Sequence, residues 1–175
     1  MALRREYDNE LCPVARSLEV IGERWTLLII RDAFFGVTRF TDFREHLGLP
    51  PAVLTERLKL LVEHGIMTTS VAVSGRSEYT LTPKGELLWP VLWSMTNWGN
   101  EFYVDTDLRR PIVHFGCGGR LTPLGNCSRC GVIPPPRDLE VHPRRSKSRD
   151  ADRTDRISRL LTKPHRLLEP FEDVA

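Results

Sequence analysis

The chain has 175 residues and a formal net charge of +2, because 25 lysines and arginines stand against 23 aspartates and glutamates. This length allows one good hydrophobic core with an appendage, while so mild a basic excess is weak evidence for a nucleic-acid partner. The sequence lacks both a run of about 20 apolar residues and the apolar centre of a signal peptide, so we expect no membrane span and a cytoplasmic location.

Two helices are predicted before Gly36, after a short polar arm over residues 1–11. The proline that follows Cys12 suits a helix start, because a first-turn proline loses no hydrogen bond. Residues 25–30 are apolar on all sides, which is typical of a central core helix. Gly22 is expected to separate the two helices or to bend one. Apolar residues recur every three or four positions across both: Val14, Leu18, Ile21 and Trp25.

The stretch from Arg39 to Leu81 predicts a winged helix-turn-helix. A short amphipathic helix is ended by Gly48 and two prolines, and a second helix follows over residues 51–64 with leucines at helical spacing. Residues 66–73 and 79–81 are rich in Val, Thr and Tyr and predict two strands, joined by a polar turn that carries Arg76. The predicted fold class is therefore mainly α with a small β-wing (α+β).

A long helix is predicted after the wing, beginning at Thr82 and continuing to about Phe102, with a kink expected at Pro90. Its faces are both partly apolar, which is more apolar surface than one small core needs. The same surplus on the first helices predicts a homodimer through the N-terminal and C-terminal helices. The alternative is that this helix only covers its own core.

The tryptophans on these helices leave a second question open. Trp25, Trp89 and Trp93 are placed so that they could line a ligand pocket for a small-molecule effector. Aromatic residues on such helices are, however, more often part of the core. The sequence alone does not choose between these interpretations.

The composition changes after residue 110. We divide the chain into a winged helix-turn-helix DNA-binding and dimerisation domain over 1–110, a small zinc-ribbon-like segment over 111–136, and a charged tail over 137–175 that we expect to be flexible. The middle segment is rich in glycine and shows little helical periodicity. Three consecutive prolines end it.

Two short motifs in the middle segment predict a structural Zn²⁺ site. A CxxC pair and an HxxC pair are each followed by glycine, and together they offer a closed tetrahedral ligand set. His142 is an alternative fourth ligand. The competing interpretations are a disulfide or redox CxxC and unliganded thiols. The predicted ligands are His114, Cys117, Cys127 and Cys130.

An ordered set of motifs between Cys12 and about Tyr103 resembles the HxlR-type family of winged helix-turn-helix transcriptional regulators, within the wider MarR-like group. The resemblance implies a homodimeric regulator that binds double-stranded DNA. The motifs are Cys12-Pro13, Ile21-Gly22-Glu23-Arg24-Trp25, Leu27-Leu28-Ile29, Arg39-Phe40-Thr41-Asp42-Phe43, Leu54-Thr55-Glu56-Arg57-Leu58, Leu60, Gly65-Ile66, Tyr79-Thr80-Leu81-Thr82-Pro83-Lys84-Gly85 and Trp98-Gly99.

The predicted DNA contacts follow from the helix at 51–64, whose outer face would enter the major groove. Arg57 is expected to read guanine, Lys59 to contact phosphate, and Arg76 to reach the minor groove or the backbone from a wing spanning 71–81. The alternative is that Glu56 and Arg57 form a solvated pair and that Arg76 only keeps its turn soluble. The full predicted set is Thr38, Arg39, Ala52, Val53, Thr55, Glu56, Arg57, Lys59 and Arg76.

Cys12 stands apart from the other cysteines. Some members of the family that the sequence resembles use a cysteine at this place as a redox sensor. A position at a helix N-terminus also favours the thiolate form. The alternative is a cysteine kept as a small apolar residue. Cys12 is therefore a possible redox sensor, and a redox or small-molecule effector is a possible partner.

The predicted function is a sequence-specific DNA-binding regulator, most simply a repressor. The alternative is a winged-helix module that binds protein without specific DNA binding; a basic face over Arg39, Arg57, Lys59 and Arg76 favours the regulator. No nucleophile–base set, phosphate loop or open metal site is recognisable in the sequence, so we expect no catalysis.

Overall fold

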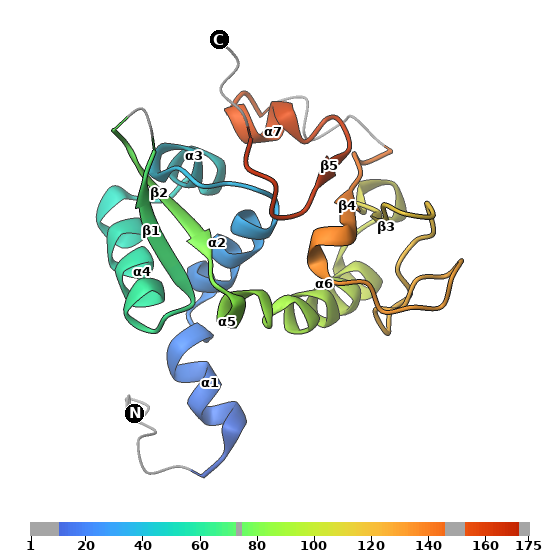
Figure 1. Ribbon diagram of the computed structural model, residues 1–175, viewed down its shortest axis with the longest axis horizontal. Coiled ribbons are helices and arrows are strands. Elements are labelled where there is room, and N and C mark those ends of the chain that lie inside the picture. Colours follow the sequence, from blue (N-terminus) through green and yellow to red (C-terminus); the bar gives the residue numbers. More distant parts are fainter. Residues whose placement is uncertain (1–10, 73–74, 146–152, 172–175) are drawn as a thin grey trace.

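The computed structural model describes residues 11–72, 75–145 and 153–171. Figure 1 shows a mainly helical molecule with a two-stranded sheet on one side and a three-stranded sheet, built by C-terminal residues, on the other. The predicted fold class, mainly α with a small β-wing, is confirmed. No helix within these ranges is long and apolar enough to cross a membrane. The predicted arm at 1–11 lies outside the described residues except for Leu11.

The first two helices form as predicted. Helix α1 (Pro13–Ile21) begins after Cys12 and ends at Gly22, and helix α2 (Arg24–Phe34) follows at once. The Glu23 side chain caps α2 by accepting a hydrogen bond from the Trp25 backbone N–H at 2.9 Å. One face of α2 forms the centre of the core, since Ile29, Ile30 and Phe34 are fully buried.

The helix-turn-helix consists of α3 (Phe40–Leu47) and α4 (Pro51–Glu63). Gly48 ends α3 with φ +66°, a left-handed conformation that favours glycine. Helix α4 buries one stripe of leucines against α2 and α3, in agreement with the predicted periodicity. The buried stripe consists of Leu54, Leu58 and Leu61.

The wing is an antiparallel pair of strands, β1 (Met67–Val71) and β2 (Ser77–Leu81), with Met67 opposite Leu81 and Val71 opposite Ser77. The Tyr79 N–H donates to the Thr38 carbonyl at 2.8 Å, so β2 is tied to the segment just before α3. The predicted turn residue Ser74 lies outside the described residues. An isolated antiparallel bridge between Arg39 and Glu78 attaches β2 to the same segment.

The helix after the wing differs from the prediction. It is divided into α5 (Pro83–Glu86) and α6 (Trp89–Tyr103), and Pro90 lies in the first turn of α6 instead of kinking a continuous helix. The physical reason is that proline lacks the N–H needed inside a helix but fits its first turn. Thr82 caps α5 through its hydroxyl, as expected, by accepting a hydrogen bond from the Gly85 N–H.

The described parts of residues 137–175 are folded, contrary to the expectation of a flexible tail. Beyond the short 3₁₀ helix η1 (Thr106–Leu108), strand β3 (Ile112–His114) pairs with β4 (Leu139–Val141), which pairs with β5 (His165–Arg166). A second 3₁₀ helix, η2 (Pro136–Asp138), precedes β4, and α7 (Arg156–Leu160) precedes β5. Isolated apolar residues between the charges supply this core. They are Leu139, Val141, Ile157, Leu161 and Leu167, each buried.

The C-terminal residues pack against the helix-turn-helix. Arg156 of α7 forms an ion pair with Asp42 of α3 at 2.7 Å, and the Leu168 N–H donates to the Phe34 carbonyl at 2.7 Å. Gly36 permits this close approach, because a Cβ atom there would lie 2.0 Å from the Glu169 carbonyl oxygen. The tail is thus part of the same folded body as the predicted reader of DNA.

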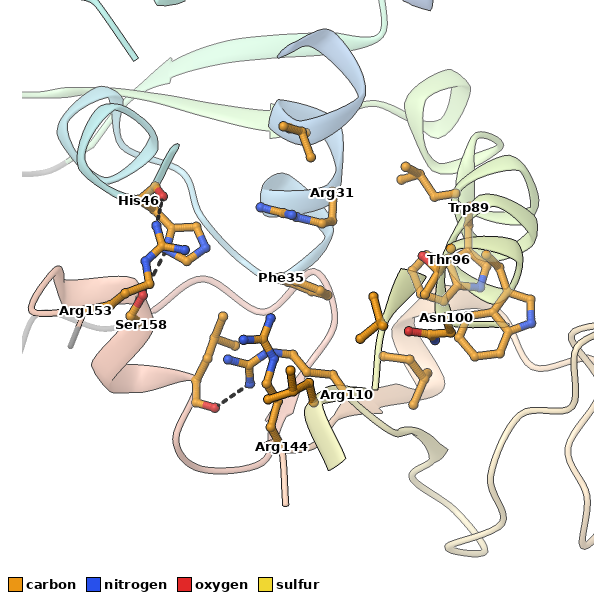
Figure 2. Close-up of a pocket in the computed structure, with 18 residues that line it drawn as sticks. Arg31, Phe35, His46, Trp89, Thr96, Asn100, Arg110, Arg144, Arg153 and Ser158 are labelled. Carbon is orange, nitrogen blue, oxygen red and sulfur yellow. Dashed lines mark hydrogen bonds between the residues drawn. The ribbon is translucent and has the colours of Figure 1, made fainter. Parts of the chain in front are cut away.

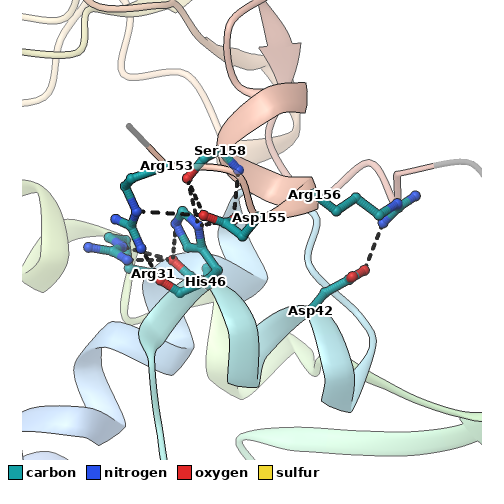
Figure 3. Close-up of polar contacts among 8 residues, drawn as sticks. Arg31, Asp42, His46, Arg153, Asp155, Arg156 and Ser158 are labelled. Atoms are coloured by element: carbon teal, nitrogen blue, oxygen red, sulfur yellow. Dashed lines mark hydrogen bonds and ion pairs between the residues drawn. The ribbon is translucent and has the colours of Figure 1, made fainter. Parts of the chain in front are cut away.

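Asp155 connects α7 to α3 through a compact polar cluster (Figure 3). Its carboxylate accepts hydrogen bonds from His46 Nδ1 at 3.0 Å and from the Ser158 hydroxyl and backbone N–H at 2.7 and 2.9 Å. Arg153 Nε lies 3.5 Å from the same carboxylate. Burial alone would raise the pKa of Asp155, but these hydrogen bonds and the neighbouring imidazole lower it to about 2.

We expect this contact to lose its contribution to stability in acid. Because the folded-state pKa of Asp155 is below the ordinary value of 3.8, its contribution is complete above about pH 4 and disappears as the pH falls through about 2. Asp155→Asn should lower the free energy of unfolding by about 1–2 kcal/mol at pH 5 and by much less at pH 2–3. Urea titrations across this range measure the difference. The exposed Asp107→Asn is the control, and a loss of stability in Asp155→Asn that does not depend on pH would contradict the assignment.

Candidate DNA-reading and metal-binding sites

Helix α4 presents an exposed face opposite its leucine stripe. Ala52, Thr55, Glu56 and Lys59 are exposed, as a recognition helix requires. The Thr55 hydroxyl donates to the Pro51 carbonyl of its own helix at 2.9 Å, while the residue as a whole stays exposed. The predicted contact residues on this helix therefore lie on one accessible surface, with Val53 half-buried at its edge.

Arg57 is the most enclosed of the predicted base-reading side chains. Its side chain is 18% exposed, and its guanidinium Nη2 lies 2.5 Å from the Glu56 carboxylate. This is the charged pair that the sequence left as an alternative. To contact DNA, the Arg57 guanidinium must break its ion pair with Glu56 and donate to an acceptor on a base instead.

The remaining predicted contacts lie around the wing. Arg76 is exposed beside the hairpin turn. Thr38 is buried just before α3, so a phosphate near it would contact the N-terminal end of α3 instead of the Thr38 side chain. Arg39 lies 4.0 Å from Glu78 and is held against β2. In Figure 1, α3, α4 and the wing occupy the same side of the molecule, away from the three-stranded sheet.

Four side chains of the middle segment converge as the sequence predicted. The Sγ atom of Cys117 lies 3.4 Å from Cys127 Sγ, 3.7 Å from Cys130 Sγ and 3.4 Å from His114 Nδ1. All four ligand atoms lie within 4.8 Å of one another. A zinc ion with Zn–S bonds of about 2.3 Å in a tetrahedron separates its sulfurs by about 3.8 Å. The spacing of this His/Cys₃ cluster therefore fits one metal ion.

The backbone around the cluster has the shape of two knuckles. Gly118 and Gly131, each directly after a ligand, adopt φ +71° and +76°, which reverses the chain so that both ligands of a pair face inward. The Gly118 N–H donates to the His114 carbonyl, and the Gly131 N–H donates to the Cys127 carbonyl. Gly119 allows the knuckles to meet, because a Cβ atom there would lie 2.4 Å from Cys127 Sγ.

The thiols differ in acidity because backbone N–H groups point at them unequally. Hydrogen bonds from the Cys130 and Arg129 N–H groups lower the pKa of Cys127 to about 6, although burial opposes them. At Cys117 the Gly119 N–H also favours the thiolate, but desolvation and the two neighbouring thiols together raise the pKa. A metal needs thiolate ligands, so the N–H groups at Cys127 favour metal binding.

His114, and not His142, completes the cluster. His142 lies at the end of β4 with its Nε2 atom 2.6 Å from the Glu140 carboxylate, while His114 Nδ1 lies 3.3 Å from Cys130 Sγ. The four described cysteines are all free thiols, and no helix follows Cys130 directly, as a redox CxxC would need. The arrangement matches a closed structural site.

Two surfaces carry exposed apolar side chains of the kind expected at an interface. Helix α1 exposes Val14 and Leu18, and Leu11 just before it is also exposed. Helix α6 exposes a stripe of larger side chains, of which the three near its C-terminal end pack on one another. These are Val91, Met95, Trp98, Phe102 and Tyr103.

A pocket lies between the helix-turn-helix and the C-terminal segment (Figure 2); the sequence left a tryptophan-lined pocket open but did not indicate this position. Trp89 and Trp93 line it, as the ligand-pocket interpretation allowed, but Trp25 does not. Arginines from four separate segments also line it, and none of them was singled out. No local pattern could have indicated them, because the arginines are far apart along the chain and only folding brings them together.

The cluster of His46, Asp155 and Ser158 resembles a catalytic triad only in composition. Ser158 Oγ and the Asp155 carboxylate both face His46 Nδ1, at 3.4 and 3.0 Å. A triad needs the two partners on opposite ring nitrogens, so that one orients the base for the other. The geometry is that of a contact between α3 and α7.

Comparison with known proteins gives consistent matches over the N-terminal part. Residues 20–107 match the family described as HxlR-like helix-turn-helix. The uncharacterized HTH-type transcriptional regulator Rv3095 of Mycobacterium tuberculosis is 42% identical over 122 residues, covering 67% of this chain and 77% of that protein. YvaP of Bacillus subtilis, likewise an uncharacterized HTH-type transcriptional regulator, is 34% identical and covers 54% and 91%. The crystal structure of PA1607, a candidate transcription factor, is 47% identical with a TM-score of 0.55 and covers 58% and 72%.

Proposed function

Because the chain belongs to the HxlR-like helix-turn-helix family of transcriptional regulators and not to a family of enzymes, we propose that it binds a specific operator as a homodimer and represses transcription there. Its proposed place of action is the cytoplasm, where a transcriptional regulator without a membrane-spanning helix would meet DNA. The observation that carries the proposal is the exposed face of α4, positioned beside a wing that carries Arg76. A groove-reading helix next to a basic hairpin is the arrangement by which winged helices hold a duplex.

Base reading is assigned to the front of α4. Arg57 is long enough to donate two hydrogen bonds to the O6 and N7 atoms of guanine, and the methyl groups of Ala52 and Thr55 suit contact with a thymine methyl group. Glu56 is the acidic member of this surface and suits a cytosine amino group. Val53 supports the helix from its half-buried position against the core.

Phosphate contacts are assigned to the surrounding cations and to the start of α3. Lys59 lies one turn beyond the base-reading residues, where it would meet the backbone. Thr38 and Arg39 precede the first free N–H groups of α3, which favour an anion. Arg76 completes the set from the wing, on the backbone or in the minor groove.

A homodimer is assigned to the exposed apolar residues of α1 and α6. Twofold symmetry would place two copies of α4 on one face, one helical turn of DNA apart. Bound in this way to a promoter, the dimer would exclude polymerase, which is the simplest route to repression. Oligomerisation would also remove from solvent large side chains such as Trp98, which is 59% exposed in the single chain.

The His/Cys₃ cluster is assigned a structural Zn²⁺ ion. The closed set of four ligands leaves no position for a substrate, and the surrounding segment holds few buried apolar side chains, chiefly Ile112 and Leu121. A metal ion would supply the folding free energy that so small a core lacks.

The role of Cys12 in redox sensing stays a prediction. Cys12 is an exposed free thiol at the N-terminal end of α1. This position leaves the thiol accessible to an oxidant, next to the apolar residues assigned to the dimer interface. Oxidation there would change the dimer contact and not the reading surface of α4.

Selection of bound sequences from a random duplex pool tests the proposed function. We expect enrichment of an inverted repeat whose half-sites are separated by about one turn of DNA, because two copies of α4 read the two halves. The pool should be bound at fixed salt, since phosphate contacts make affinity strongly salt-dependent. Recovery of sequences without enrichment would favour a winged-helix module that binds protein, and an enriched site without inverted symmetry would contradict the homodimer.

A further inference from the structure

One stripe of α6 combines aromatic and neutral polar side chains along a pocket of about 510 Å³ (Figure 2). The stripe consists of Trp89, Trp93, Thr96 and Asn100, whose spacings of four, three and four residues return to one face of a helix. The pocket is closed on other sides by α2 and by residues near β3 and α7, beyond the family match. Its volume suits a small organic molecule.

The tryptophans of this stripe form a rigid aromatic wall. Trp89 and Trp93 lie with their ring centroids 6.1 Å apart and their planes at 20°, and Phe34 packs on Trp89 at 5.2 Å. The Trp93 indole N–H donates to the Thr122 carbonyl at 2.9 Å, which fixes the second ring. Phe35 faces the wall from α2 (Figure 2). A flat aromatic ligand packs on such a wall more closely than a saturated one does.

The charged side chains among the described lining residues are engaged with the protein itself. Arg31 donates twice to the fully buried Asp32, at 2.6 and 2.9 Å. His46 Nδ1 lies 3.0 Å from the Asp155 carboxylate. Arg153 donates to the His46 carbonyl and lies 3.5 Å from the same carboxylate. These groups therefore already have partners on the side of the pocket opposite to α6.

The two other arginines of the lining are engaged as well. Arg110 donates to the Leu161 carbonyl at 2.8 Å, and Arg110 and Arg144 each have a further partner within the chain. A charged ligand would have to displace one of these contacts. The group left behind, such as the Asp32 carboxylate, would then be buried without a counter-charge, which is strongly unfavourable. An uncharged ligand leaves all of these contacts intact.

The neutral polar groups of the pocket come from α6. Thr96 and Asn100 follow the tryptophans on the same stripe and face the same space (Figure 2). A hydroxyl and a side-chain amide can each donate and accept a hydrogen bond. Together they suit one uncharged polar substituent placed at the edge of a ring that lies on the wall.

We propose that this pocket binds an uncharged, flat aromatic molecule of about two fused rings that carries a hydroxyl group. The rings lie against Trp89 and Trp93, and the hydroxyl exchanges hydrogen bonds with Asn100 and Thr96. The charged side chains keep their internal partners and close the opposite side.

Binding also has a route to the reading surface, and this part rests on the proposed function. Phe35 and Trp89 line the pocket from the family fold, whereas Leu161, just after α7, lines it from the docked segment. A ligand that touches both parts stabilises the arrangement in which α7 packs on α3. We expect operator affinity to depend on this arrangement, because α3 supports α4. Each ligand then changes the affinity for the other by the same factor.

The first test compares naphthalenes that carry different substituents at the same ring position, using the full-length chain without DNA. Calorimetric titration should show naphthol binding about tenfold or more tighter than naphthoate or naphthylmethylammonium, because each charged probe must displace an internal pair. Decahydronaphthol, whose rings are saturated, should bind about fivefold more weakly than naphthol. A charged probe that binds as tightly as naphthol would overturn the assignment to an uncharged ligand, and equally tight binding of decahydronaphthol would overturn the aromatic one.

The second test locates the hydroxyl group of the ligand. Asn100→Leu keeps the size of the side chain but removes its hydrogen-bonding group, so it should weaken naphthol binding about three- to tenfold without weakening methylnaphthalene binding. Ser94→Ala, at an exposed position of α6 outside the pocket, is the matched control and should change neither affinity. An Asn100→Leu variant that loses affinity for both probes equally, or for neither, would contradict the assigned hydrogen bond.

A cavity-filling variant tests whether the pocket is the binding site. Gly99 lines the pocket, and a Cβ atom there meets nothing within 4 Å, so Gly99→Leu should extend into the cavity while α6 stays folded. Naphthol binding should fall by about tenfold or more, with the thermal unfolding transition retained. Unchanged naphthol binding in this variant, or no wild-type binding up to millimolar concentration, would overturn the pocket assignment.

The regulatory step has a separate readout. The titrations contain no DNA, so their result does not depend on the proposed function. With the selected operator, saturating naphthol should shift the wild-type affinity and leave that of Gly99→Leu unchanged. An unchanged wild-type affinity would overturn the coupling, and failure to select any operator would count against the proposed function alone.

Discussion

Cys127→Ser is expected to abolish stoichiometric zinc in the purified protein and to open residues 112–133 to proteolysis. Cys127 is the most enclosed of the four cluster residues, with 1% of its surface exposed, and its sulfur receives the Arg129 N–H at 3.4 Å. Serine offers no thiolate, and three remaining ligands do not close a tetrahedron. Metal affinity should fall by more than about 100-fold.

The measurement is metal content per chain together with a chelator titration. Cys12→Ser is the matched control and should keep its zinc, because Cys12 precedes α1, which lies at the opposite side of the molecule from β3 in Figure 1. Gly119→Ala keeps all four ligands but places a Cβ atom 2.4 Å from Cys127 Sγ, and it should weaken zinc binding without removing a donor. Wild-type protein without stoichiometric zinc, and with four titratable thiols, would end the assignment.

We expect the winged helix-turn-helix to stay folded after loss of the metal, whereas the environment of α6 should change. The core around Phe34, Phe43 and Leu54 is built mainly by residues outside the cluster segment, which adds only Ile112 and Leu121 to it. Trp93, however, donates its indole hydrogen bond to Thr122 between the two knuckles. We therefore expect tryptophan fluorescence to change on chelation while most helical circular dichroism remains.

Arg57→Ala is expected to cost about 1–3 kcal/mol of binding to the selected operator and to relax base preference at one position of each half-site. The physical reason is the loss of paired hydrogen bonds to one guanine. Arg76→Ala should act differently, weakening specific and random duplexes alike and reducing the salt dependence of binding by about one counterion.

Both variants should be measured on operator and random duplexes at several salt concentrations. Lys163→Ala, an exposed cation of the C-terminal segment, is the control for net charge alone. If Glu56 and Arg57 are only a solvated surface pair, Arg57→Ala will leave both affinities unchanged. If Arg76 only keeps the turn soluble, its replacement will not alter the salt dependence.

Most of the reading unit was predictable from the sequence, because its signals are local. Leucine spacing indicated the buried stripe of α4, and Gly48 indicated the end of α3, since only its own backbone conformation is involved. The four cluster residues were also predictable, because two knuckles of fixed spacing impose their own geometry. We expected Pro90 to kink a continuous helix, but it lies in the first turn of α6, a position that proline chemistry equally allows.

The C-terminal segment was the main failure, and the reason is physical. Its apolar residues are single and separated by charges, so no window of sequence shows a periodicity. They are buried because β4 pairs with β3 and α7 packs against α3, and both β3 and α3 lie far upstream in the sequence. His46 with Asp155 and Asp42 with Arg156 are pairs 109 and 114 residues apart.

The sequence by itself therefore determined the family, helix α4, the wing and the three cysteines of the cluster, since each depends on residues within a few turns of one another. Only the tertiary structure decided that His114 and not His142 joins the cysteines, that Thr38 is buried, and that four arginines face two tryptophans across one cavity. These features arise where distant segments meet, and neither composition nor spacing records which distant residues will be neighbours.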